Sequence, residues 1–592
     1  MAFAPRLILS LLLLGPLRAQ GPDTVAFRQW IAGQEAGGSR QKTFREPQGE
    51  RVESQEWTRL ARQGTVIEQQ LRETALRHPD GSMAFTWTLT LSQEPLEGEA
   101  TWSPLEPTRL QVTFKNGAPR TLEVPADVVL WPGAEDESLK AAARKGTPLK
   151  MRGYSLPAQQ WTGLDLAPLG PDPLPGFPDA VRFKGRVSEG TLAAEIELWV
   201  SPRHGRLKHI TSLGGIPILS QRTELPPPPE AGPDAGLFER TLKTLPRHPF
   251  LLWLPAARVR WTGQGVQALP EDPQQRAAGP NRFELAGALA PTGAAAAELP
   301  VKGKPGPEDA PFLAATPLVQ FQDPVFAGLE QRLRAPAGAS RWELAKRITA
   351  FVYDWIKEKN YTVGFASAQE VARIPKGDCT EHGVLAVALL RRLGVPARGV
   401  TGWVAIGETL GLHFWIEARI GGRWIPLDPT FAQAPASTYR LKLGTTDLAD
   451  LGSVEWESAA THFLEGSWVP DGPWATDVRV QGDTALVPGG RALRVAGSRW
   501  TYGGGRLDLI WEGAHGVEAV PCPAPAQLTA ARFLQGARTG RTGWWDPASR
   551  QLWMDLGGGQ WLGFDALGES LAFRLLDALE ARQLAPAKAK AA

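Results

Sequence analysis

The chain has 592 residues, more than a single hydrophobic core usually organises, so several domains are expected. Apolar residues make up 43% of the sequence and charged residues 21%, a balance that favours folded domains over intrinsic disorder. The net charge is only +2, and no block of Lys or Arg forms the stripe that phosphate backbones require, so nucleic acid is not an expected partner.

The N-terminus has the pattern of a secretory signal. The apolar run at residues 7–14 follows Arg6 and is followed by small residues up to Ala19, as the regions of such a signal require. The run is too short to cross a bilayer, which takes about 20 apolar residues, and no later segment reaches that length. We therefore expect a signal peptide at residues 1–19, no transmembrane anchor after its removal, and a periplasmic or secreted protein. An apolar helix retained in the fold is the alternative.

Two β-rich segments precede the middle of the chain. Residues 20–225 contain short alternating runs, such as 85–91 and 193–200, separated by turn residues such as Asp80-Gly81, which predicts an N-terminal domain of mainly antiparallel strands. A proline-rich stretch then predicts a linker. Residues 237–319 form a second β-leaning segment with a connection rich in Pro, Gly and Ala.

Helical and strand patterns alternate in the next domain, residues 320–465. Ser340 and Glu343 fit a capping box, and the apolar spacing beyond them predicts a helix. The predicted helices span 341–359 and 379–393, and the predicted strands span 399–406, 413–420 and 423–427. Residues 466–592 predict a C-terminal β-rich domain that ends in a helix at 567–582.

The chain has two cysteines, Cys379 and Cys522. Cys522 lies in a proline-rich loop and is interpreted as incidental. Cys379 opens a predicted helix, where the helix dipole and unpaired N–H groups favour a thiolate and lower the thiol pKa. An isolated cysteine is more commonly a small buried apolar residue. A disulfide between the two cysteines would leave no nucleophile at 379.

A predicted hairpin brings a histidine and an aspartate together. Gly421-Gly422 fits a two-residue turn, so Ile420 pairs with Arg423. His413 and Asp428 then lie diagonally on one face, with their backbones about 7 Å apart. Asp428 can orient the imidazole while its other nitrogen faces a thiol, as in nucleophilic catalysis. A solvated strand histidine and a turn-forming Asp-Pro are the alternative reading.

Five motifs in residues 367–431 resemble the core of the transglutaminase-like superfamily. They are Ser-Ala-Gln-Glu-Val, Gly-Asp-Cys-Thr-Glu-His, Leu-Arg-Arg-Leu-Gly-Val-Pro-Ala-Arg-Gly-Val-Thr-Gly-Trp, His-Phe-Trp-Ile-Glu and Trp-Ile-Pro-Leu-Asp-Pro-Thr. The resemblance implies an α+β fold, a papain-like transglutaminase core, here flanked by mainly antiparallel β domains. By matching position it makes Cys379 the nucleophile, His413 the base and Asp428 the orienting residue. The β-rich N-terminal part also resembles the layout of exported bacterial members.

The resemblance implies a cysteine enzyme that acts on peptide or protein amides through an acyl-thioester. The calcium-binding loops of the animal cross-linking enzymes are not recognisable, which favours a peptidase or amidase over a cross-linking transferase, without a metal or other cofactor. Glu381 and His382 are candidate substrate-binding residues, with a structural helix role as the alternative. A non-catalytic envelope module that uses the same fold as a scaffold, with other envelope proteins as partners, is the second functional hypothesis.

Overall fold

The computed structural model describes most of residues 23–471 and the backbone of short strands between residues 479 and 575. The predicted signal peptide and Cys522 lie outside the described residues. So do residues 63–64, 92–94, 116–118, 158–159, 190–191, 214–215, 225–241, 245–255, 264–268, 287, 289, 360–365, 407–408, 437–439 and 450–465. Within the described part of the chain, no helix is long and apolar enough to cross a membrane.

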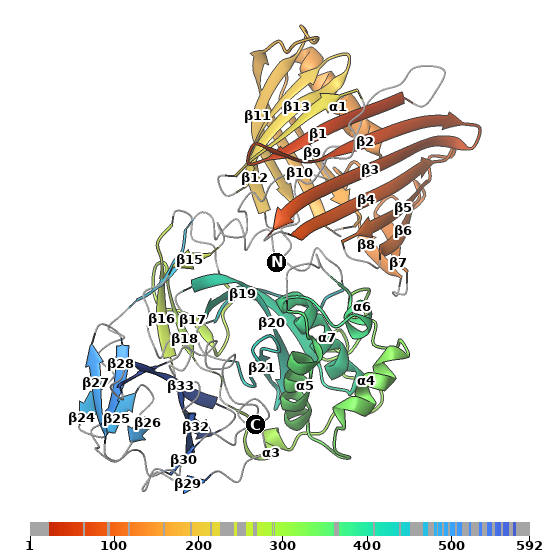
Figure 1. Ribbon diagram of the computed structural model, residues 1–592. Helices are drawn as coiled ribbons and strands as arrows, with labels where there is room; N and C mark the ends of the chain where they lie inside the picture. The colour runs from red at the N-terminus through yellow and green to blue at the C-terminus, as the bar shows by residue number, and fades with distance from the viewer. Residues whose placement is uncertain are drawn as a thin grey trace.

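The N-terminal part forms one curved antiparallel sheet of fourteen strands (Figure 1). The spatial order runs from β8 back through β1, then from β14 back to β9, so β1 and β14 join the two halves. The alternating sequence explains this, since Met83–Thr90 buries every second residue. The strands are β1 Asp23–Ile31, β2 Gln34–Glu46, β3 Gly49–Arg62, β4 Thr65–Arg77, β5 Met83–Thr90, β6 Leu96–Trp102, β7 Arg109–Phe114, β8 Arg120–Glu123, β9 Leu149–Ser155, β10 Gln160–Pro171, β11 Val181–Glu189, β12 Leu192–Ser201, β13 Gly205–Leu213 and β14 Ile216–Thr223.

The predicted turn at Asp80-Gly81 is confirmed. It joins β4 to β5, where Gly81 adopts φ +85° and its N–H donates to the His78 carbonyl at 2.9 Å. Only a residue without a Cβ takes that backbone conformation without strain.

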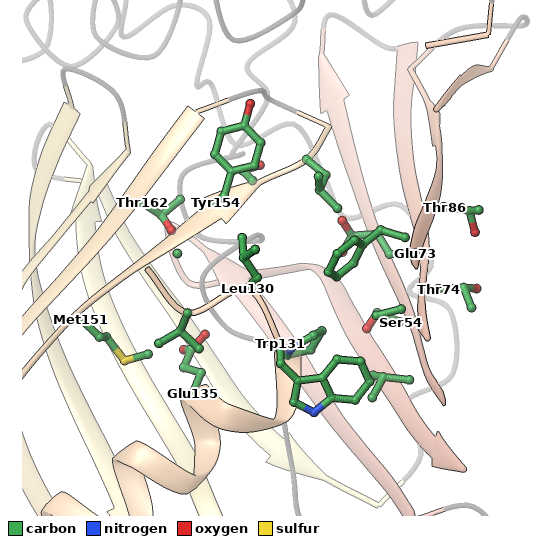
Figure 2. Close-up of a pocket in the computed structure, with 18 residues that line it drawn as sticks. Ser54, Glu73, Thr74, Thr86, Leu130, Trp131, Glu135, Met151, Tyr154 and Thr162 are labelled. Atoms are coloured by element: carbon green, nitrogen blue, oxygen red, sulfur yellow. The ribbon is translucent and has the colours of Figure 1, made fainter. Parts of the chain in front are cut away.

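A helix that the alternating pattern did not reveal, α1 Pro132–Lys145, packs inside the curve of the sheet against β9, β12 and β13. Leu139, Ala142 and Ala143 join a core that includes buried residues of β9 and β12. Figure 2 shows its first turn, where Trp131 and Glu135 face the hollow between the two halves of the sheet.

The next sheet contains the strands predicted for the 320–465 domain. Its order is β15-β20-β19-β22, with β21 paired to β20, and helices α5 and α7 pack against it. The helices are α3 Gly293–Ala296, α4 Val325–Leu333, α5 Arg341–Trp355, α6 Ala368–Arg373 and α7 Cys379–Arg392. The strands are β15 Lys243–Thr244, β19 Ala397–Ile406, β20 Thr409–Ile420, β21 Arg423–Leu427 and β22 Arg440–Thr446.

The predicted boundaries in this domain agree closely with the structure. The capping box at Ser340 and Glu343 starts α5, and α7 starts at Cys379. The α5 helix ends at Trp355, four residues before the predicted 359. The chain is mostly β outside these helices, as expected.

The segment at 237–319 does not form a sheet of its own. β15 pairs with β20, while β16 Ala256–Trp261, β17 Gln275–Ala277 and β18 Arg282–Ala286 form a sheet with β23 Trp468–Pro470 from beyond the core. Trp261 and Trp468 pack on Trp403 of β19, with ring centroids 6.1 and 6.3 Å away. These tryptophans therefore join the small sheet to the core.

The C-terminal part consists of short strands in two sheets. They are β24 Arg479–Gln481, β25 Thr484–Val487, β26 Arg491–Arg494, β27 Ser498–Gly503, β28 Arg506–Trp511, β29 Val520–Pro521, β30 Arg532–Gln535, β31 Thr542–Asp546, β32 Gln551–Gly557, β33 Gln560–Leu567 and β34 Ala572–Leu575. The helix predicted at 567–582 is wrong where the structure describes it, because β34 pairs there with β28 and β33. Partner strands far along the chain outweigh local helical spacing in that segment.

Candidate active site

The start of helix α7 fixes the position of Cys379. Asp378 is the N-cap, and its side chain accepts hydrogen bonds from the Thr380 N–H at 3.0 Å and the Thr380 hydroxyl at 2.7 Å. Glu381 completes the capping box by accepting from the Asp378 N–H at 2.9 Å. Cys379 is therefore held as the first helical residue, as the sequence predicts.

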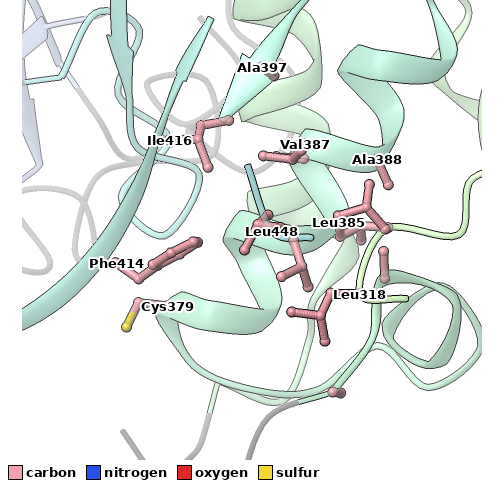
Figure 3. Packing of buried hydrophobic residues seen from close by; sticks show 14 of the residues in the cluster. Leu318, Cys379, Leu385, Val387, Ala388, Ala397, Phe414, Ile416 and Leu448 are labelled. Atoms are coloured by element: carbon pink, nitrogen blue, oxygen red, sulfur yellow. The ribbon is translucent and has the colours of Figure 1, made fainter. Parts of the chain in front are cut away.

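Close packing brings this helix start against β20 (Figure 3). A Cβ on Gly383 would lie 2.4 Å from the Phe414 ring, and one on Gly399 would meet the same ring at the same distance. Only glycine leaves room for the ring between helix and sheet. The Phe414 N–H donates to the sulfur of Cys379. Cys379 is a free thiol, and the residue is 6% exposed. The thiol thus lies beside the residue that follows His413.

His413 and Asp428 meet as the predicted register requires. Ile420 pairs with Arg423 in the structure, and His413 Nε2 lies 2.8 Å from Asp428 Oδ2. The predicted contact between the two side chains is confirmed, and both are buried. Because an ionised carboxylate only accepts hydrogen bonds, Nε2 carries the proton and Nδ1 is the nitrogen left to receive one.

A third buried residue, Arg440 on β22, holds Asp428. Its Nη2 lies 2.6 Å from Asp428 Oδ2 and also donates to Gln433 at 2.8 Å. The other carboxylate oxygen accepts from the backbone N–H groups of Thr430 and Phe431. Burial by itself raises the pKa of Asp428, but His413 and Arg440 outweigh burial and hold the pKa below its ordinary value. Asp428 therefore stays ionised next to the imidazole.

The sequence gives no signal for Arg440. It lies twelve residues beyond Asp428, outside the five motifs, and only the pairing of β22 with β19 brings it back to the site.

The environment of the Cys379 thiol differs from the prediction. Burial raises the pKa of the thiol well above its ordinary value of 9.0, and the carboxylate of Asp378 raises it further. The hydrogen bond from the Phe414 N–H lowers the thiol pKa, but less than burial and Asp378 raise it. The prediction of a lowered thiol pKa is therefore wrong for this structure, because the fold buries the sulfur and the capping residue Asp378 places a carboxylate beside it.

Asp378→Asn is expected to lower the pKa of the Cys379 thiol, because asparagine keeps the cap and removes the charge. The measurement is the rate of iodoacetamide labelling at Cys379 across pH, with the midpoint expected above 9 in the wild type and lower in the variant. Equal midpoints would mean that the carboxylate does not act on the thiol.

Glu381 and His382 lie in the first turn of α7, and both are buried. Glu381 is fully buried and its carboxylate accepts from the backbone N–H groups of Ala366 and Asp378. His382 is fully buried, and its Nδ1 donates to the Asp378 carbonyl at 2.6 Å. These contacts fit the structural helix role that was the alternative to substrate binding.

The second nitrogen of His382 contacts Lys359. With Nδ1 protonated, Nε2 accepts from Lys359 Nζ at 3.1 Å. Burial lowers the pKa of His382 to about 4, and the neighbouring Lys359 lowers it too, so the ring is neutral at physiological pH. His382 is therefore a fixed support under the helix start.

Part of the chain matches a known family model. Residues 327–429 match the family model described as the transglutaminase-like superfamily. No curated protein matches the chain.

In the described residues, no group of three or more His, Cys, Asp or Glu side chains is placed to hold a metal ion.

Three solved structures are similar over parts of the chain. The "Putative Cysteine Protease" from Cytophaga hutchinsonii has 18% identity and a TM-score of 0.24, covering 36% of this chain and 83% of that one. A beta-barrel-like protein of a domain of unknown function from Brucella abortus has 11% identity and a TM-score of 0.28, covering 35% of this chain and 98% of that one. The "Putative Protease" from Parabacteroides distasonis has 9% identity and a TM-score of 0.16, covering 85% of this chain and 92% of that one.

Proposed function

We propose that this chain is a cysteine acyl-transfer enzyme with a papain-like core, because residues 327–429 match the family model of the transglutaminase-like superfamily. Cys379 is the nucleophile, His413 the base and Asp428 the orienting residue. The observation that carries this proposal is the 2.8 Å contact from His413 Nε2 to Asp428, which leaves Nδ1 for a thiol held at the neighbouring Phe414.

The proposed reaction begins with a neutral thiol. As the sulfur of Cys379 attacks an amide carbonyl, His413 Nδ1 takes the thiol proton, and the same nitrogen then gives it to the leaving amine. Loss of the amine leaves an acyl-thioester on Cys379. Asp428 stabilises the imidazolium that forms in between, and Arg440 keeps Asp428 ionised for this role.

The first residue of α7 supplies a candidate donor for the oxyanion. The N–H groups at the start of a helix have no partner within the helix, and Cys379 is the first residue of α7. We propose its own N–H as a donor to the negative oxygen of the tetrahedral intermediate.

The group that attacks the thioester decides the kind of enzyme. Attack by water makes a peptidase or amidase, and attack by an amine makes a cross-linking enzyme. We place hydrolysis of peptide or protein amides first, since the sequence contains no recognisable calcium-binding loops of the animal cross-linking enzymes. The test uses p-nitrophenyl acetate as a simple acyl donor. A burst of p-nitrophenolate equal to the enzyme, absent in Cys379→Ala, is expected, followed by turnover to acetate.

Added cadaverine shows how the thioester is resolved. For a hydrolase, acetate remains the main product, while a transferase converts most of the acetyl group to acetylcadaverine. A burst that persists in Cys379→Ala would contradict the proposal, because another group would then carry the acyl chain.

The second candidate is a non-catalytic envelope module that uses the same fold as a scaffold. The observation that favours it is the buried thiol, whose pKa is raised by burial and Asp378. In that case no burst appears in the wild type, although the His413 and Asp428 contact is intact.

We also propose export to the periplasm or the medium, on the N-terminal sequence alone. The mass of the protein purified from its native host tests this. A chain that begins near residue 20 supports export, and an intact N-terminus contradicts it.

A further inference from the structure

An aromatic ring that the proposed reaction does not use lies over the imidazole of His413. Phe431 directly follows the last of the five sequence motifs and is half-buried. Its ring centroid is 5.1 Å from that of His413, with 29° between the two planes. The two rings are therefore stacked, and stacking restricts how the imidazole can turn.

The loop that carries Phe431 is fixed to the proposed orienting residue, Asp428. Asp428 and Gln433 exchange two backbone hydrogen bonds, one from the Asp428 N–H at 2.8 Å and one from the Gln433 N–H at 2.9 Å. Within the loop, the N–H groups of Thr430 and Phe431 donate to Asp428 Oδ1 at 3.0 and 3.3 Å. The same residue that contacts His413 thus sets the position of Phe431.

The chain reverses directly after Phe431. Ala432 adopts φ +50°, a left-handed conformation that residues with a Cβ rarely take. The reversal leads to Gln433, whose side chain accepts from Arg440 at 2.8 Å. Backbone strain of this kind persists where the surrounding structure requires it, and here it accompanies the placement of the Phe431 ring.

The ring of Phe431 also lies near the buried cation of the site. The guanidinium carbon of Arg440 is 5.9 Å from the Phe431 centroid, and Arg440 Nη2 is 2.6 Å from Asp428 Oδ2. The face of an aromatic ring attracts positive charge. A ring stacked on His413 is therefore expected to stabilise the imidazolium that forms when His413 takes a proton.

A second ring near His413 belongs to the core. Trp415 is 2% exposed, and its ring lies 6.3 Å from that of His413 with 18° between the planes. A Cβ on Gly402 would lie 2.6 Å from the Trp415 ring, so β19 holds the indole closely. Phe431 lies on a loop instead, and can be replaced without opening the sheet.

We propose that Phe431 is a positioning residue, whose ring holds the plane of the His413 imidazole so that Nδ1 faces the thiol of Cys379. The ring also stabilises the imidazolium during acyl transfer. This inference rests on the proposed function, because it requires His413 to be the base. In this role Phe431 acts through His413 and makes no contact with the substrate.

The first test is the p-nitrophenolate burst from p-nitrophenyl acetate in Phe431→Leu and Phe431→Tyr. Leucine keeps apolar bulk without a ring, whereas tyrosine keeps the ring. The burst rate should fall about tenfold in Phe431→Leu and stay within about threefold of the parent in Phe431→Tyr. A Phe431→Leu variant as fast as the parent, or a Phe431→Tyr variant as slow as Phe431→Leu, would overturn the proposal.

The matched control is Phe351→Leu on α5. Phe351 is also half-buried, and its ring stacks on Trp355 with centroids 5.8 Å apart, outside the residues proposed for acyl transfer. Its replacement should leave the burst rate unchanged. A slower burst in this control would show that loss of any stacked ring slows acylation, which would contradict a specific role for Phe431.

The same substitution in a His413→Ala background shows whether Phe431 acts through His413. Phe431→Leu should slow the burst in the parent and cause no further loss in His413→Ala, because the group that it positions is already gone. A similar loss in both backgrounds would overturn the proposal, since Phe431 would then act on Cys379 or on the fold as a whole.

Proton NMR of the histidine rings tests the stacking without any reaction, in proteins that carry Cys379→Ala. The chain has eight histidines, so the His413 signals are assigned by their loss in His413→Ala. The face of an aromatic ring shields protons that stack on it, so these signals should move downfield in Phe431→Leu and not in Phe351→Leu. Unchanged signals in Phe431→Leu would overturn the proposal. If the parent shows no burst, the proposed function fails, and this measurement still decides whether Phe431 holds the imidazole.

Discussion

His413→Ala is expected to slow acylation of Cys379 by p-nitrophenyl acetate by about 10²–10⁴-fold. The thiol of Cys379 is protonated in this structure because burial raises its pKa, so it needs a base when it attacks. His413 is the base whose orientation is fixed, through its 2.8 Å contact with Asp428. The rate of the p-nitrophenolate burst in stopped flow measures the effect.

The pH dependence separates this role from a general loss of structure. In the wild type, His413 accepts the thiol proton during acylation. In His413→Ala, the residual rate should depend on pH only through the ionisation of the Cys379 thiol. Added imidazole should restore part of the lost rate, since the deleted side chain leaves space beside Asp428. A burst rate that is unchanged in His413→Ala would show that another group takes the proton.

Arg440→Gln is expected to lower the free energy of unfolding by about 3–5 kcal/mol, because it leaves the carboxylate of Asp428 buried with fewer partners. Arg440 and Asp428 are both almost fully buried, so solvent cannot replace the lost contacts. Urea unfolding at neutral pH, followed by tryptophan fluorescence, measures the difference.

The difference should shrink in acid. The folded pKa of Asp428 is below its ordinary value of 3.8, so its stabilising contribution is present above that pH and is lost as pH falls toward the folded value. Arg440→Gln removes part of the cause of this lowered pKa. Arg423→Gln, at an exposed position on β21, should change stability by no more than about 0.5 kcal/mol. An Arg440→Gln variant as stable as this control would mean that the buried pair is not stabilising.

Local signals predicted the core of the site well. The helix from Cys379 was predicted, and in the structure Asp378 and Glu381 cap its start. The meeting of His413 with Asp428 follows from the two-residue turn that sets the register. These features depend on residues close together in the sequence, where capping and turn chemistry decide the conformation.

Long-range contacts account for what the sequence could not reveal. Arg440 reaches Asp428 only because β22 pairs with β19, and α1 is held by strands from the far half of the N-terminal sheet. The predicted direction of the pKa shift at the Cys379 thiol was wrong for a similar reason. The helix dipole acts locally, but burial by the whole fold and the capping carboxylate act more strongly.

The location of the acyl group tests the central claim most directly. The protein is mixed with p-nitrophenyl acetate, quenched in acid during the burst, digested, and its peptides are measured by mass spectrometry. The account predicts one acetyl group on Cys379 in the wild type, and far less in His413→Ala at the same time. An acetyl group on lysines or on Cys522 with Cys379 unmodified, or equal acetylation of Cys379 in the two proteins, would contradict it.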